Sequence, residues 1–107
     1  MKPWKSYHES LMTDLKNPEE AAGYLNAVLA EGDYPMFRVA LRNVAETHCG
    51  MLHLSKRTKL SRPNLYRMLS KNGRPEISSL SKILKTFGLT LSVSFSSKAQ
   101  SDLKKAA

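Results

Sequence analysis

The chain has 107 residues, of which 41% are hydrophobic and 24% are charged, and its formal net charge is +8. This length predicts one small domain, no apolar stretch is long enough to span a membrane, and a single cysteine excludes an intramolecular disulfide framework. The charge is uneven: residues 1–50 hold five basic and seven acidic side chains, and residues 51–107 hold twelve and two, so −2 and +10 sum to +8. A basic half predicts a polyanionic partner. Because the first residues are charged and lack the apolar run of a secretion signal, we expect a cytoplasmic protein.

The N-terminal segment, residues 1–16, carries a stripe of apolar side chains at steps of three and four residues. The stripe predicts a weakly amphipathic helix, or a segment that becomes ordered on a partner. We expect it to pack on another protein, or loosely on its own domain, and not to belong to a five-helix core. Its members are Trp4, Tyr7, Leu11 and Leu15.

Start and stop signals then predict a run of helices over residues 17–88. Asn17 followed by Pro18 predicts a helix start, and Gly32 predicts its end; Ala21, Ala22, Leu25, Val28 and Leu29 would form its buried face. A second helix begins at residue 33 or 34 and ends at Gly50. The next three are expected over about 51–58, 62–70 and 77–87, with a tight turn at 59–61, a loop at 71–75 and an end at Gly88.

The basic run 56–74 is the most informative part of the chain, because it holds seven basic residues and no acidic one. Two short helices at a tight turn, the second with a basic outer face, fit the major groove of DNA. We interpret Arg62, Asn64 and Arg67 as base readers, because Arg can read guanine and Asn can read adenine. Phosphate contacts suit Tyr66, Lys71, Asn72 and Arg74. Ser61, the capping residue at the mouth of the helix, is the eighth predicted DNA-binding residue. An ordinary solvated helix face is the alternative.

Residues 89–95 change period and alternate apolar with polar side chains, which is typical of a β-strand. A lone strand cannot satisfy its backbone groups, so we expect it to pair with a second copy of the chain. The predicted domain therefore covers residues 17–96 and is followed by a basic, disordered tail over 97–107. The predicted dimerisation residues are Leu89, Leu91, Val93 and Phe95.

No pattern in the chain indicates catalysis, a cofactor or a metal. His48, Cys49 and His53 are the only cluster resembling metal ligands, but His48 and Cys49 are adjacent on a helix and would point apart. No serine lies in a nucleophile elbow, no acidic pair suggests a catalytic cleft and no glycine-rich phosphate loop is present. We expect a binding protein and not an enzyme.

The chain resembles the HigA-like antidote proteins of bacterial and prophage addiction modules, with a lambda-repressor-like helix-turn-helix. The resemblance runs from about Leu15 to Phe95 and is carried by residues 15–27, 33–41, 60–70, Gly73-x-Pro75 and 83–89. It implies a mainly α, five-helix domain that binds a small RelE-like toxin and, as a homodimer, represses its own operon on double-stranded operator DNA. Where such motifs usually carry a small residue and a turn glycine, this chain has Ser55 and Lys59. A left-handed backbone at Lys59 would cost roughly 1 kcal/mol. Pro63 stands where relatives often carry a polar groove-facing residue.

Two other hypotheses about function remain open from the sequence. A stand-alone prophage-type regulator would bind DNA without a toxin, and an adjacent gene for a small basic protein would argue against it. An RNA-binding basic module would bind RNA in a salt-sensitive way without preferring an inverted repeat.

Overall fold

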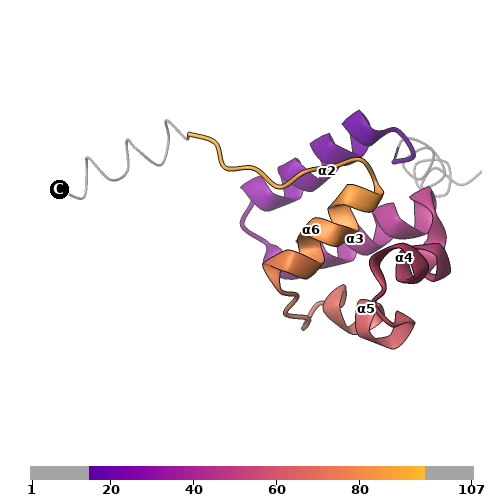
Figure 1. Ribbon diagram of the computed structural model, residues 1–107. Helices are drawn as coiled ribbons and strands as arrows, with labels where there is room; N and C mark the ends of the chain where they lie inside the picture. The colour runs from indigo at the N-terminus through magenta and orange to yellow at the C-terminus, as the bar shows by residue number, and fades with distance from the viewer. Residues whose placement is uncertain (1–14, 96–107) are drawn as a thin grey trace, which may run out of the picture.

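The computed structural model describes residues 15–95 and holds five helices in this range (Figure 1). This mainly helical architecture confirms the predicted helices. Their bounds are α2 Pro18–Ala30, α3 Tyr34–His48, α4 Gly50–Thr58, α5 Arg62–Met68 and α6 Ile77–Thr86.

Three helices begin where a polar side chain caps exposed backbone amides. Asn17 Oδ1 accepts from the amides of Glu19 and Glu20, at 2.8 and 3.3 Å, ahead of α2. Asp33 Oδ1 accepts from Met36 at 3.1 Å ahead of α3, and Ser61 Oγ accepts from Asn64 at 3.2 Å ahead of α5. Each of these helices also has a proline in its first turn, where no intrahelical donor is lost.

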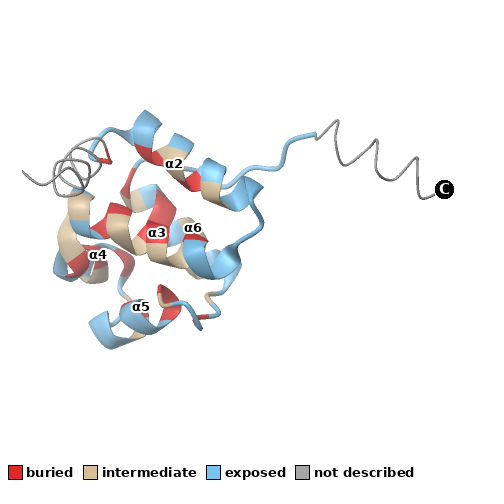
Figure 2. Ribbon diagram, turned by 180° about the vertical axis from the view of Figure 1, so that it is seen from behind, coloured by how far each residue is buried: buried red, intermediate tan, exposed pale blue. Residues whose placement is uncertain are grey.

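The core is built around α3, whose inner face is Phe37, Ala40, Leu41, Val44 and Ala45 (Figure 2). α2 packs on one side of α3, while α4 contacts α3, α5 and α6. Leu15 is also a core residue, because only 1% of its surface is exposed. The expectation that this member of the N-terminal stripe has no place in the core is therefore wrong. Trp4, Tyr7 and Leu11 lie outside the described residues, as does the predicted tail 97–107.

Two further expectations need correction. α5 ends at Met68, not Ser70, because the chain turns at residues 69–72 toward the loop before α6. Leu29 was predicted on the buried face of α2 but remains 37% exposed at the end of that helix, beside Phe37. Ala22 and Val28, from the same predicted face, are half-buried.

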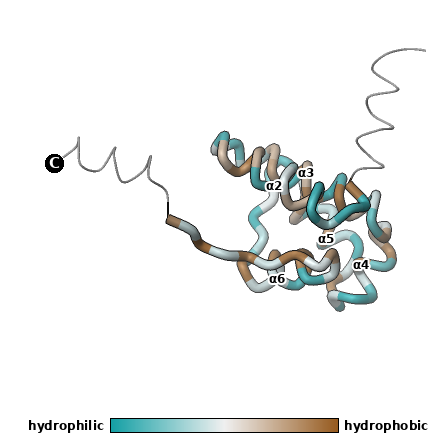
Figure 3. The backbone as a smooth tube through the Cα atoms, turned by 90° about the horizontal axis from the view of Figure 1, so that it is seen from above, coloured by the Kyte–Doolittle hydropathy of each residue, from teal (hydrophilic) through white to brown (hydrophobic). Residues whose placement is uncertain are grey.

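Residues 89–95 leave the end of α6, pass α2 and extend away from the helices (Figures 1 and 3). Between residues 15 and 95 the structure assigns no β-strand, so the predicted strand and its pairing between subunits stay predictions. Of the four predicted dimerisation residues, Leu89 is half-buried against the core, whereas Leu91, Val93 and Phe95 are exposed. Figure 3 shows the apolar positions alternating along this segment.

Among residues 15–95, no helix has the length and apolar character that crossing a membrane requires.

Candidate nucleic-acid interface

The turn between α4 and α5 is held by three hydrogen bonds, all of which involve the side chain of Ser55 or Thr58. Lys59 adopts the left-handed conformation expected from the sequence, with φ 62° and ψ 26°. The Ser55 hydroxyl donates to the Leu60 carbonyl at 2.5 Å, and the buried Thr58 hydroxyl donates to the Leu54 carbonyl at 2.7 Å. The Leu60 amide donates back to Thr58 Oγ1 at 3.4 Å. These bonds fix the direction in which α5 leaves the turn.

α5 attaches to the core through one apolar face. Leu65, Met68 and Leu69 are all buried, as the spacing predicted. A helix of seven residues cannot be stable by itself, so its position depends on this packing and on the Ser61 cap.

The opposite face of α5 and the loop after it are exposed to solvent. Seven of the eight predicted DNA-binding residues are exposed, and Asn64 is half-buried. Tyr66 lies 42% exposed beside Arg62 and Pro63, which line a shallow hollow on α5 with it. In the described part of the chain, none of the seven basic side chains of the run 56–74 forms an ion pair. Their positive charge is therefore available to a polyanion.

Arg38 of α3 is a positioning residue that was not predicted from the sequence. Its Nε donates to the Ser70 carbonyl at 3.0 Å and its Nη2 donates to the Lys71 carbonyl. A guanidinium bonded to the carbonyls that follow a helix satisfies groups that would otherwise lack partners and suits the negative end of the helix dipole. Arg38 thus links α3 to the exit of α5. No local signal marks it, because its partners lie more than 30 residues away.

Gly73 closes the same exit by close packing. A Cβ atom at this position would lie less than 3.0 Å from the carbonyl oxygens of Met68 and Arg67, which is a steric clash. The Gly73 amide donates to the Ser70 carbonyl at 3.1 Å. Only glycine allows the loop that carries Lys71, Asn72 and Arg74 to fold back so closely on α5.

The His48, Cys49 and His53 cluster does not converge. The His48 ring packs against Phe87 with centroids 5.3 Å apart, while His53 is exposed on α4. Burial raises the pKa of the Cys49 thiol, and the nearby Arg57 charge offsets part of that rise. A thiol with a raised pKa is a poor nucleophile and a poor metal ligand. Among residues 15–95, no three His, Cys, Asp or Glu side chains gather in a way that could hold a metal ion.

A second basic cluster was not predicted from the sequence. Arg57 of α4 comes together with Lys82, Lys85 and Thr86 of α6 around a shallow hollow. Residues on two helices that are distant in sequence form it, so only the packing of α4 on α6 reveals it.

Residues 7–95 match the family model described as probable addiction module antidote protein. The chain belongs to this family. Neither the curated proteins nor the solved structures gave a significant match. Membership assigns an antidote, or antitoxin, role in a toxin–antitoxin module and implies a toxin partner. The match covers every described helix and the segment after α6.

Proposed function

We propose that this antidote binds a small RelE-like toxin and, as a homodimer, binds operator DNA and represses its own operon. The role is one of binding, without catalysis, in the cytoplasm. The observation that carries the DNA-binding part is the exposed, uncompensated basic face of α5 on a buried apolar base. α4, the Lys59 turn and α5 would form a lambda-repressor-like helix-turn-helix, with α5 as the recognition helix.

The residues divide into two roles in this proposal. Arg62 and Arg67 reach base edges from the outer face of α5, while the half-buried Asn64 has less reach. Lys71, Asn72 and Arg74 follow the helix on an exposed loop, where they contact phosphates and set the register, together with Tyr66. Ser61 holds the first turn through its cap.

The toxin would meet the less basic half of the molecule. Residues 1–50 carry a net charge of −2, and Glu31 and Asp33 are exposed at the turn between α2 and α3. Such a surface complements a basic, RNA-cleaving protein, which would favour rapid association. The predicted toxin contact of residues 1–14 lies outside the described residues.

The homodimer would form through residues 89–95, which have exposed apolar side chains and no backbone hydrogen bond to another described residue beyond Leu89. Antiparallel pairing across a two-fold axis would satisfy the backbone groups along one edge of this segment. Such a dimer would place two recognition helices about 34–36 Å apart, one turn of DNA.

Co-expression with the small protein encoded beside this gene tests the antitoxin part. We expect that protein to stop growth when expressed alone, and co-expression to restore growth and yield a complex. DNA upstream of the gene pair should be retarded by the antidote in a gel. If cells grow normally when the neighbouring protein is expressed alone, and the DNA is still retarded, the chain is a stand-alone regulator. If the chain binds RNA more tightly than this DNA, it is an RNA-binding module.

A further inference from the structure

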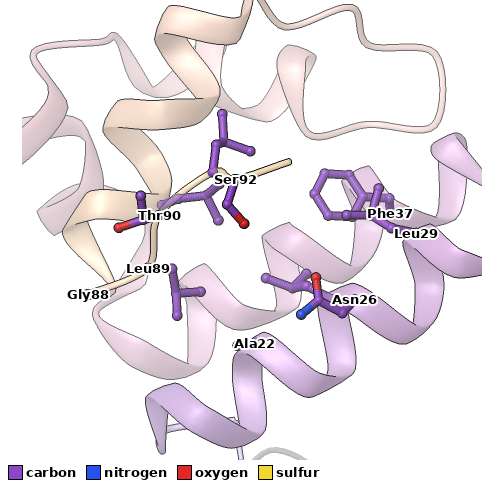
Figure 4. Close-up of a pocket in the computed structure, with 11 residues that line it drawn as sticks. Ala22, Asn26, Leu29, Phe37, Gly88, Leu89, Thr90 and Ser92 are labelled. Atoms are coloured by element: carbon purple, nitrogen blue, oxygen red, sulfur yellow. The ribbon is translucent and has the colours of Figure 1, made fainter. Parts of the chain in front are cut away.

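A groove lined mainly by apolar side chains lies between α2 and the segment that follows α6 (Figure 4). Leu25 and Leu29 of α2 and Phe37 of α3 form part of its wall, and residues 88–92 form its other edge. The groove measures about 250 Å³, and Asn26 lies at its rim on the exposed side of α2. A cavity of about 150 Å³ already accommodates a benzene ring. The groove is therefore large enough for one aromatic side chain.

The segment that forms one edge of the groove also carries apolar side chains that nothing covers. Val93 is fully exposed and Phe95 is 78% exposed, although both continue the alternating face of Leu89 and Leu91. The backbone of residues 90–95 makes no hydrogen bond to another described residue. Unpaired backbone and exposed aromatic surface on one short segment indicate an interaction site.

We propose that this groove binds the side chain of Phe95 from a second copy of the chain, so that each subunit inserts one phenylalanine into the other. The inference rests on the proposed homodimer and adds the occupant of the groove. The expected occupant is a second copy because one edge of the groove is the same segment that would pair across the two-fold axis.

The register of antiparallel pairing brings Phe95 to the groove. Residues directly opposite in such a pair point to the same face, so the apolar faces coincide only when the axis passes through a residue. Centred on Val93, the pairing sets the partner's Phe95 opposite Leu91; centred on Ser92, it sets the partner's Phe95 opposite Leu89. Leu89 and Leu91 line the groove together with Thr90 and Ser92 of the alternate face. Of the two faces, only that of Leu89 and Leu91 continues to an aromatic ring, Phe95. Either register therefore carries the ring to the mouth of the groove, within about 4.5–5.5 Å between Cβ atoms.

Sedimentation of the full chain tests the energetic role of Phe95. We expect Phe95→Ser to raise the dimer dissociation constant at least tenfold, whereas the matched control Ser94→Ala, on the opposite face of the same segment, stays within about threefold. Asn26→Trp, which fills the groove from its rim, should weaken the dimer in the same way while circular dichroism shows an unchanged helical content. A wild-type dimer that Phe95→Ser leaves unchanged overturns the insertion, but leaves the proposed strand-paired repressor intact.

Cross-linking between different copies identifies the occupant. In a Cys49→Ser background, which removes the single cysteine, one tagged copy carries Asn26→Cys and a second carries Phe95→Cys. We expect a short bis-maleimide to join the two copies at least tenfold more efficiently than it joins Asn26→Cys to Ser94→Cys. Equal cross-linking efficiency at positions 94 and 95 overturns the proposal. So does a double variant, with Asn26→Cys and Phe95→Cys on one chain, that cross-links only within that chain while the two separate copies do not cross-link. A wild-type chain that is monomeric at all concentrations, yet still neutralises the toxin, overturns the dimer and the insertion together.

Discussion

Arg67 and Lys71 lie close in sequence but in different settings, one on the exposed face of α5 and the other on the loop that follows it. We expect Arg67→Ala to cost about 1–3 kcal/mol on the cognate site and to relax specificity, because a base contact is lost. Lys71→Ala should weaken binding to cognate and random DNA equally, because one phosphate contact is lost. The slope of the logarithm of the binding constant against the logarithm of the salt concentration should fall in magnitude by about one. Fluorescence anisotropy at several salt concentrations measures both effects. If the two variants weakened all sequences alike, the assignment of separate roles would be wrong.

Gly73 and Gly23 make a matched pair of glycines. A Cβ at Gly73 would clash with backbone carbonyls of α5, whereas a Cβ at Gly23, inside α2, would meet no atom within 4 Å. We expect Gly73→Ala to destabilise the protein by about 1–3 kcal/mol, as overpacking does. Gly23→Ala should stabilise it by about 0.5–1 kcal/mol, because alanine loses less backbone entropy in a helix. Urea denaturation measures both, and a neutral Gly73→Ala would show that the exit of α5 tolerates displacement.

At the scale of elements, the α4–α5 turn is strained at one residue. Lys59 is the only non-glycine residue with positive φ among residues 15–95. We expect Lys59→Gly to stabilise the protein by up to about 1 kcal/mol, since glycine adopts this conformation without steric cost. For a domain of this size the melting temperature would rise by about 4–8 °C per kcal/mol. Lys56→Gly removes the same charge inside α4 and should destabilise the protein by about 0.5–1 kcal/mol. Two variants that lower the melting temperature equally would contradict the strain at Lys59.

The elements that could be predicted from the sequence are those set by local chemistry. Asn17, Asp33 and Ser61 cap helices because their side chains reach amides only two or three residues ahead, which the sequence states directly. The exposed face of α5 follows from its period in the same way. Exposure at the ends of helices could not be predicted from the period. Leu29 continues the apolar face of α2, yet no neighbouring helix covers it fully.

The residues that position the candidate site could not be predicted from the sequence, because their contacts depend on the packing of helices that are distant in sequence. Arg38 reaches the exit of α5 from α3, and the second basic cluster joins α4 to α6. Leu15 shows the same limit at the N-terminus, since its burial depends on which helices close over it.

At the scale of the whole molecule, one small domain would carry two separate interaction surfaces. The basic face of α5 would meet DNA, and the more acidic half, around α2 and α3, would meet the toxin. The segment 89–95 would hold two such domains together and so set the spacing of their recognition helices. A single fold could thus couple the amount of free toxin to repression of the operon.

Selection of bound sequences from a random pool of double-stranded DNA tests the central claim most directly. The account predicts that the wild-type protein enriches an inverted repeat with half-site centres one DNA turn apart, about 34–36 Å. Arg67→Ala should retain binding to the pool but lose a defined base in each half-site. Recovery of an unenriched pool, or of single half-sites without symmetry, would contradict the account.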